Sequence, residues 1–271
     1  MGWLSWRWGV GGALLAIAVW PFVTGILRSF AREFGIVSAL YAVWNLGGRI
    51  RAFGVDQAFE RGELIWEFQQ ALYLPSEAWL QEMILPYSWI VKSANIYYAL
   101  AHVPFFAWSL VWVWWRHRDH YASYRTQMAL FTGTSLLIQL VAVAPPRFVE
   151  LTGMVDTGVF YNQSVYSALG RAQIGQLQAM PSIHVGWALF VGAATYRFAK
   201  APWLKWLGVA HAVATMWAVM VTANHYWMDG IVAGLIMVFW YAVVHGGRRL
   251  LRQESPATAA PADTTEALQP A

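Results

Sequence analysis

The chain has 271 residues, of which 58% are hydrophobic and 12% charged, and its formal net charge is +4. Soluble domains carry roughly 25% charged residues, so this composition excludes an ordinary soluble domain and indicates an α-helical membrane protein. The absence of cysteine excludes disulfides, thiolate catalysis and cysteine metal sites. The basic residues lie between apolar runs, so they indicate membrane topology and not a nucleic-acid or nucleotide partner.

The N-terminal region, residues 1–93, is predicted to hold one transmembrane anchor followed by helices at the membrane surface. The anchor is expected from about Val10 to Leu27, with Pro21 tolerated as a kink. It shows no cleavage signature of a signal peptide. Residues 34–46 are bracketed by arginines and are too short to span comfortably, so they predict an interfacial or partly inserted helix. A further membrane span is the alternative.

A mixed segment, residues 54–92, comes next. Glu60, Glu63 and Glu67 alternate with apolar residues at helical spacing, and a break follows at Leu74–Glu77. This pattern predicts one or two amphipathic helices that lie on the membrane or cap the bundle. A solvated linker is the alternative interpretation.

Residues 94–252 are predicted to form the catalytic transmembrane core. Five spans are expected, at Ala94–Trp115, Thr126–Ala144, Ser182–Phe198, Trp203–Thr222 and Asn224 to about His245. The tail, residues 253–271, is rich in Pro, Ala and Thr and is expected to be disordered. The predicted fold is all-α, with about six transmembrane helices and amphipathic interfacial helices before the second span.

Two short motifs place ionisable groups at the mouths of predicted spans, Met180-Pro-Ser-Ile-His184 and His225-Tyr-Trp-Met-Asp229. Ionisable groups at such depth are costly and therefore mark a functional site. The four-residue spacing predicts that His225 and Asp229 share one helical face, where the carboxylate holds one ring nitrogen and leaves the other as a nucleophile or base. Pro181 is expected to open a helix whose N–H groups, with the Ser182 hydroxyl, face an anion. Phosphoryl transfer is the predicted chemistry.

The distribution of lysine and arginine orients the predicted bundle. With the N-terminus inside, the cytoplasmic segments hold ten basic residues and the short outer loops hold two, Arg147 and Arg171. The long first loop holds six more, but long loops count weakly. This orientation places the C-terminal tail in the cytoplasm. It places both motifs on the extracytoplasmic side.

At these residues the chain resembles the type 2 phosphatidic acid phosphatase superfamily, and within it inositol phosphorylceramide synthase, the inositolphosphotransferases and their bacterial relatives. The two histidine motifs carry the resemblance. It is supported by Ala144–Arg147, Gly153–Thr157, Asn224–Trp227 and the pattern Asn95, Tyr98, His102. The resemblance covers about residues 60–248. It implies a bacterial plasma-membrane enzyme with no cofactor or metal, whose donor and acceptor are membrane lipids.

The resemblance also implies roles for individual residues. His225 would be the nucleophile that forms a phosphohistidine, Asp229 its orienting carboxylate, and His184 the acid that protonates the leaving oxygen. Candidate contacts to substrate or phosphate are Ser182, Arg147, Arg171, Asn95, His102, Asn224 and Tyr226. Arg147 fits a lipid-headgroup contact as well as a clamp on the transferred phosphate. For Asn95 and His102, a structural hydrogen bond is the alternative.

Three departures from the superfamily pattern bear on the substrate. The usual Lys followed by Arg-Pro is replaced by Pro145-Pro146-Arg147, Ala218 and Val219 stand where a Ser-Arg pair is usual, and Ile183 replaces a Gly. A phosphate monoester carries more negative charge than a diester, and its cleavage relies on several cationic groups. We therefore expect a lipid phosphotransferase that moves an inositol-phosphate-like headgroup. A lipid phosphate monoester phosphatase is the alternative.

Other classes of function remain open for the same residues. Two histidines and a carboxylate could form a facial metal triad, or a transporter could use them as a proton relay. They could also be a buried polar network that only ties helices together. His211 is expected to be a hydrogen-bonded core histidine. The donor lipid, the acceptor lipid and the oligomeric state are left open.

Overall fold

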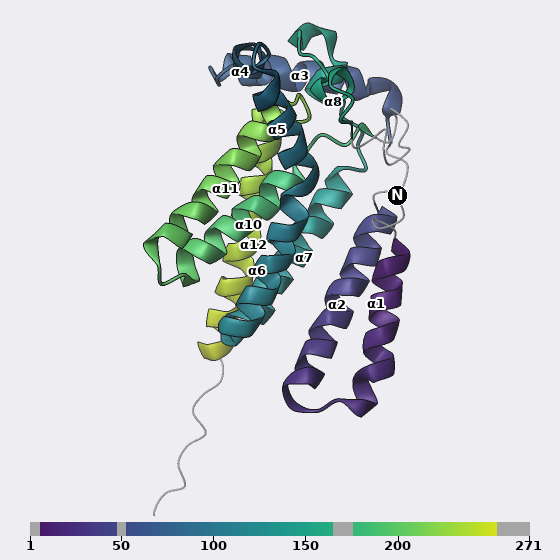
Figure 1. Ribbon diagram of the computed structural model, residues 1–271, viewed down its shortest axis with the longest axis vertical. Helices are drawn as coiled ribbons and strands as arrows, with labels where there is room; N and C mark the ends of the chain where they lie inside the picture. The colour runs from purple at the N-terminus through teal and green to yellow at the C-terminus, as the bar shows by residue number, and fades with distance from the viewer. Residues whose placement is uncertain (1–5, 48–52, 165–175, 254–271) are drawn as a thin grey trace, which may run out of the picture.

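The computed structural model describes residues 6–47, 53–164 and 176–253, which form an all-α fold (Figure 1). The helices that run along the bundle are α5 (Ser88–Leu100), α6 (His102–Arg116), α7 (Arg118–Ile138), α10 (Ile183–Phe198), α11 (Pro202–Val221) and α12 (Trp227–Gln253). Three further helices lie across one end of the bundle (Figure 1): α3 (Ala58–Ala71), α4 (Glu77–Ile84) and α8 (Thr157–Phe160). The predicted all-α fold class is confirmed. The tail beyond residue 253 lies outside the described residues.

Two helices of the described chain are long and apolar enough to cross a membrane, Pro202–Val221 and Trp227–Gly246. The bent pair α5–α6 adds a third if it counts as one span. Helices α1 and α10 have 14 and 16 residues, which at ~1.5 Å per residue falls short of the ~30 Å hydrocarbon core. The described helices therefore indicate a membrane protein, and the six-span arrangement stays a prediction.

The predicted span from Ala94 to Trp115 is not one straight helix, because the chain bends by 45° between α5 and α6. The break falls at Ala101, three residues before Pro104. Proline has no N–H to bond the carbonyl of the residue four positions earlier, and its ring clashes with that carbonyl. Leu100, the residue affected, is the last residue of α5. The bend places His102 at the start of α6.

The predicted anchor from Val10 to Leu27 is also wrong. Helix α1 (Trp6–Val19) stops at the short 3-10 helix η2 (Trp20–Phe22), which contains Pro21, and α2 (Gly25–Gly47) begins after a reversal of the chain. Pro21 breaks the helix for the reason given above, and Gly25 adopts a left-handed φ of 55° that suits a tight turn. Residues 34–46, predicted as an interfacial helix, are the second half of α2.

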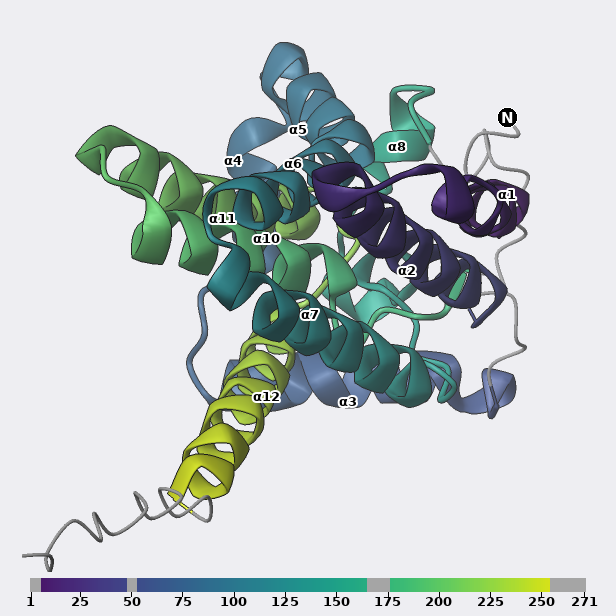
Figure 2. The same cartoon turned by 90° about the horizontal axis from the view of Figure 1, so that it is seen from below.

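Helices α1 and α2 pack against each other as a close hairpin. A methyl group on Gly9 would lie 2.5 Å from the carbonyl oxygen of Ser38 and 2.7 Å from the amide nitrogen of Ala42. Small residues at such positions allow two helix backbones to approach closely. Seen from below, α2 is the member of the hairpin that faces the bundle (Figure 2). The hairpin is therefore one unit that meets the bundle through α2.

The predicted span Thr126–Ala144 is wrong at both ends, since α7 runs from Arg118 to Ile138. Residues 141–144 are extended. Val143 donates its N–H to the carbonyl of Leu177, and Ala144 donates to the carbonyl of Ala58. Pro145 and Pro146 follow, and they favour extended backbone over helix. The short 3-10 helices η3 (Val55–Gln57), η4 (Pro146–Phe148) and η5 (Glu150–Thr152) complete this end of the molecule.

The remaining predictions about helices agree more closely with the structure. Residues 54–92 do form two short helices, α3 and α4, before α5 begins, and they cap the bundle (Figure 1). The span Trp203–Thr222 matches α11 within one residue at each end. The last span begins at Trp227 and not at Asn224. This correction matters for the site, because it leaves His225 in the loop before α12.

Candidate active site

The two sequence motifs lie side by side, at the starts of α10 and α12. The backbone N–H of Ser182 donates to the carbonyl of Asp229 at 3.1 Å, and His225 donates its own N–H to the carbonyl of Val219. Ser182 is the N-cap of α10, and its hydroxyl accepts the N–H of Val185 at 3.3 Å. Pro181 therefore precedes the cap and does not occupy the first helical turn as predicted. The bond between Ser182 and Asp229 joins the starts of two helices that are more than 40 residues apart in the sequence.

The imidazole of His225 is held through one nitrogen. Its Nδ1 lies 2.8 Å from the carbonyl oxygen of Ala179 and 3.0 Å from Oδ2 of Asp229. A carbonyl oxygen can only accept a hydrogen bond, so Nδ1 carries the proton and the lone pair of the neutral ring lies on Nε2. The predicted reach between His225 and Asp229 is confirmed. Their predicted place on one helical face is wrong, since His225 precedes α12.

Asp229 lies in the first turn of α12 and is fully buried. Its Oδ2 accepts both the His225 Nδ1–H and the backbone N–H of Tyr226, the latter at 2.9 Å. A buried carboxylate needs such donors, because its removal from water is costly. The helix N-terminus adds a favourable dipole. Asp229 is thus placed to orient the imidazole and to stabilise positive charge on it.

His184 lies beside His225, with ring centroids 5.6 Å apart. It stands in the first turn of α10 and is half-buried. The ring of His102 meets it edge-on at 4.3 Å, and the ring of Tyr98 lies 4.8 Å away. The bend between α5 and α6 therefore brings His102 to the site, as the sequence predicted. Tyr98 belongs to the same cluster, although its role was not predicted.

Next to these rings is a small recess that has no room for a water molecule. It is lined by Tyr97, Tyr98, His102, His184, Thr215, Ala218 and Val219. Ala218 and Val219 are each 1% exposed and form an apolar wall opposite the histidines. An apolar wall offers no hydrogen bond to the oxygens of a phosphate. Ala218 and Val219 therefore give a phosphate beside His184 no hydrogen-bond partner on that side.

Arg147 braces the loop that carries His225. Its Nη1 donates to Oδ1 of Asn224 at 2.6 Å and its Nη2 to Oε1 of Gln176 at 3.0 Å. The guanidinium also lies 3.4 Å from a carboxylate oxygen of Asp156. Asn224, in turn, donates to Thr222. The structure thus gives Arg147 and Asn224 structural partners, and their contact with phosphate stays a prediction. Arg171 lies outside the described residues.

Two further candidates are engaged away from the histidines. Tyr226 is fully buried, and its hydroxyl donates to the carbonyl of Ala144 at 2.9 Å. Burial, with the nearby Asp229 charge, raises the pKa of this phenol. Asn95 bonds the Thr157 hydroxyl at 2.8 Å and its carbonyl at 3.1 Å. Both side chains hold the fold together, so a hydrogen-bonding role is the better interpretation for each.

Glu77 is a residue of the site region that the sequence did not reveal. It is fully buried, and its Oε1 accepts the backbone N–H of Trp227, the first residue of α12, at 2.9 Å. Both of its oxygens accept from Gln69 Nε2 at 2.7 Å. Burial raises the pKa of this carboxyl, although the Trp227 N–H opposes the shift. Glu77 therefore caps the helix that carries Asp229. No sequence signal could have shown this, because the partners are 150 positions apart.

The chain matches one known protein family over most of the bundle. The PAP2 superfamily model matches residues 63–244, which include the site but neither α1 nor α2. The chain belongs to the PAP2 superfamily. Membership indicates phosphatase or phosphotransferase chemistry on lipid phosphates. Comparisons with curated proteins and with solved structures returned no match.

A metal centre has no support from the described side chains. Within residues 6–47, 53–164 and 176–253, no group of three His, Asp or Glu side chains is arranged to hold a metal ion. The arrangement instead offers an imidazole with a free Nε2, a carboxylate behind it and a second imidazole beside it. Such a set can perform nucleophilic attack followed by proton transfer.

Proposed function

We propose that the protein is a lipid phosphotransferase that moves a phosphorylated headgroup between membrane lipids through a phosphohistidine on His225. The observation that carries this proposal is the double acceptor at Nδ1, formed by Asp229 and the Ala179 carbonyl. It leaves Nε2 as the nucleophilic nitrogen. Membership of the PAP2 superfamily supports lipid phosphates as the substrate class.

The proposed reaction has two displacements that need no metal. Nε2 of His225 attacks phosphorus, the bond to the leaving alcohol breaks, and protonated His184 gives its proton to the leaving oxygen. The acceptor hydroxyl then attacks phosphorus, loses its proton to His184, and the phosphorus–nitrogen bond breaks. Asp229 stabilises the positive imidazole ring of the intermediate, the role of a buried aspartate in hydrolase triads.

The charge around the site favours a phosphodiester over a monoester as donor. Arg147 already faces Asp156 at 3.4 Å, so its charge is partly balanced within the protein. The positions where the superfamily usually has a Ser-Arg pair hold Ala218 and Val219, which wall the recess beside His184. A monoester would bring nearly two negative charges to the histidines, where the described part of the chain offers Arg147 with its charge already partly balanced. An inositol-phosphate-like headgroup on a diester brings one.

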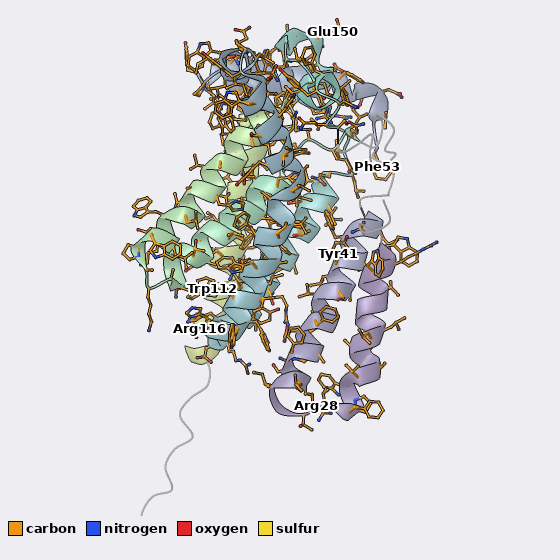
Figure 3. All side chains as sticks on the ribbon, viewed as in Figure 1. Arg28, Tyr41, Phe53, Trp112, Arg116 and Glu150 are labelled. Atoms are coloured by element: carbon orange, nitrogen blue, oxygen red, sulfur yellow. The ribbon has the colours of Figure 1, made fainter. Side chains whose placement is uncertain are left out.

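The orientation of the site is part of the proposal. The α6–α7 turn, with Arg116 and Arg118, lies at the end of the bundle opposite α3 and α4 (Figure 3). The α10–α11 turn, with Arg197, Lys200 and Lys205, follows the other end of α10 from His184. Basic residues favour the cytoplasmic side. We therefore place His184 and His225 on the extracytoplasmic side of the bacterial plasma membrane.

The phosphohistidine can be trapped directly. The purified protein is incubated with a phosphorus-labelled phosphoinositide, quenched in alkali and tested for acid-labile label on histidine. His225→Ala should retain none, whereas His245→Ala, on the C-terminal half of α12, should label as the parent protein does. Label that persists in His225→Ala would refute the proposal. Activity should also survive EDTA; loss that zinc restores would favour a metal mechanism.

The second candidate, a monoester phosphatase, is favoured by the usual activity of the superfamily. A comparison of two substrates separates the two functions. The enzyme is given a labelled phosphoinositide with a lipid alcohol as acceptor, and separately a lipid phosphate monoester. Headgroup transfer to the alcohol supports the transferase. Fast release of inorganic phosphate from the monoester, with no transfer to any acceptor, would establish the phosphatase instead.

A further inference from the structure

A cavity of about 560 Å³ lies between the α1–α2 hairpin and the face formed by α6, α7 and α10. Its volume is within the ~300–1,000 Å³ typical of small-molecule sites. Almost all of its lining is apolar or aromatic. The hairpin that forms one wall lies outside the residues that match the PAP2 superfamily. The cavity is therefore built partly from an element that the superfamily match does not include.

One end of the cavity is next to the candidate active site. Trp187 lines the cavity three residues after His184 on α10, and Val103 lines it directly after His102 on α6. At ~1.5 Å of rise per residue, the cavity wall begins within about one helical turn of the two histidines. The indole N–H of Trp187 donates to the hydroxyl oxygen of Thr132 at 3.0 Å, so the ring presents only apolar atoms to the cavity.

The other end of the cavity is far from the site and is lined by paired charges. Tyr121 and Leu136, both lining residues on α7, are fifteen positions apart, which corresponds to about 22 Å along the helix. At the Tyr121 end, the buried carboxylate of Glu33 pairs with Arg125 of α7 and with Arg32 at 2.8 Å. These charges satisfy one another, so this end is not an anion site. The length exceeds the roughly 15 Å of hydrocarbon in one leaflet.

We propose that this cavity binds the hydrocarbon chain of the lipid whose phosphate reaches His225. The identification of that lipid as the substrate depends on the proposed function. The apolar lining excludes a polar headgroup, because a buried polar group without partners is costly. The length suits a long chain. The two helices that carry His102 and His184 continue into the cavity wall, so a chain attached to a phosphate at the histidines has to extend only about one helical turn to reach it.

Filling the cavity tests the proposal, and two glycines give a matched pair of variants. Gly133 of α7 lines the cavity, and a Cβ there would meet no atom within 4 Å. Gly11 of α1 is exposed and does not line the cavity, and a Cβ there would also meet no atom within 4 Å. Gly133→Trp should therefore fill the cavity without a clash in the helix. Gly11→Trp is the control for the added indole.

Both variants are compared on a long-chain phosphoinositide and on a short-chain, water-soluble one. Gly133→Trp should lower kcat/KM for the long chain by about tenfold or more, since about two buried methylene groups are worth that factor. It should leave the short-chain substrate unchanged, and Gly11→Trp should affect neither. An equal loss on both substrates, or no loss on the long one, would overturn the proposal.

A binding experiment separates this proposal from the proposed function. Full-length His225→Ala in nanodiscs is photolabelled with a phosphoinositide that carries a diazirine near the end of its acyl chain. Adducts should form on lining residues such as Trp44, Phe106 and Met128, and Gly133→Trp should remove them. Adducts there, with no transfer activity in the parent protein, would support the cavity and refute the transferase. Adducts on the exposed faces of α11 and α12, or labelling that excess phosphate-free lipid removes equally well, would overturn the cavity proposal alone.

Discussion

The active-site end of the molecule and the α1–α2 hairpin are attached to the bundle by different kinds of contact. At the site, directional hydrogen bonds join elements distant in sequence, such as His225 to Ala179 and Glu77 to Trp227. At the hairpin, aromatic rings carry the contact: Phe30 meets Trp114 at 5.3 Å and Trp44 meets Trp187 at 5.2 Å. Glu33 and Arg125 add one buried ion pair.

The two kinds of contact suit two different functions, catalysis at the site and lipid-chain binding at the hairpin. Hydrogen bonds fix both distance and direction, which a nucleophile and its proton donor require. Apolar contacts have no preferred direction, and two faces joined by large rings can leave a cavity between them. Substitutions at the site should therefore change the rate of the chemistry, whereas substitutions at the hairpin should change which lipid chain is accepted.

The largest effect is expected at Asp229. Asp229→Asn keeps the size of the side chain but removes the charge that orients and stabilises the His225 imidazole, so kcat should fall on the order of 10²–10⁴-fold. Steady-state kinetics on long-chain and short-chain substrates should give the same loss. Asp119→Asn, on the exposed first turn of α7, is the matched control and should leave kcat unchanged. A loss below about tenfold would mean that the carboxylate does not support the nucleophile.

Glu77 should show the next largest effect, through position and not through contact with substrate. Glu77→Ala leaves the first N–H of α12 without its acceptor, which should cost about 1–3 kcal/mol of stability. Because α12 carries Asp229, kcat should fall while KM changes little. Thermal unfolding in detergent and steady-state kinetics measure the two effects. Glu82→Ala, exposed on the same helix, is the control. Glu77→Gln should restore kcat to the parent value. If Glu77 had only a structural role, kcat per folded molecule would be unchanged in Glu77→Ala.

The raised pKa of Glu77 also predicts a pH effect on stability. Its folded-state pKa lies above the ordinary 4.5, so the folded protein binds the proton more tightly than the unfolded chain. Its contribution to stability is present below the ordinary pKa and is lost as pH rises through the folded-state value. As the pH rises, the unfolding temperature of the parent protein should therefore fall relative to that of Glu77→Gln. The same series with Glu82→Gln should be flat, and a trend of opposite sign for Glu77 would contradict the assignment.

The smallest effect on chemistry is expected inside the hairpin. Gly9→Leu forces α1 away from Ser38 and Ala42 of α2, so it should loosen the hairpin and lower the unfolding temperature. Turnover of a short-chain substrate should change by less than about threefold, since no site residue lies on the hairpin. Gly11→Leu, in open space on the same helix, is the control. A collapse of short-chain turnover in folded Gly9→Leu would show that the hairpin supports the site directly.

Several differences between the predicted and the observed helices lie at prolines. The sequence predicts a tolerated kink at Pro21, yet the chain reverses there. Pro104 lies inside a predicted span, yet α5 ends at the residue whose carbonyl it blocks. Hydropathy alone could not reveal these breaks, because an apolar run remains apolar whether or not its helix is interrupted. The proposed division at residue 93 and the six spans stay predictions.

The candidate site shows a similar division between near and distant contacts. The pairing of His225 with Asp229 could be predicted, because four residues separate them and local geometry restricts their distance. Arg147 and Tyr226 are predicted to contact substrate or phosphate, and the structure shows which protein groups they bond. Their hydrogen bonds to Gln176 and Ala144 involve partners 29 and 82 positions away, which no local pattern indicates. The structure therefore gives both side chains a role in holding the fold together, and their contact with phosphate stays a prediction.

By itself, the sequence determined the all-α class, the apolar elements and the two motifs whose residues perform the proposed chemistry. These depend on composition and on spacings of a few residues, and at such short spacings backbone geometry restricts which side chains can share a face. Only the tertiary structure decided which nitrogen of His225 is free, because the carbonyl of Ala179 lies 46 positions away. It also decided that Glu77 caps α12 and that a cavity lies between the hairpin and the bundle. Contacts between distant segments depend on how whole helices pack, and that packing cannot be inferred from any one stretch of the chain.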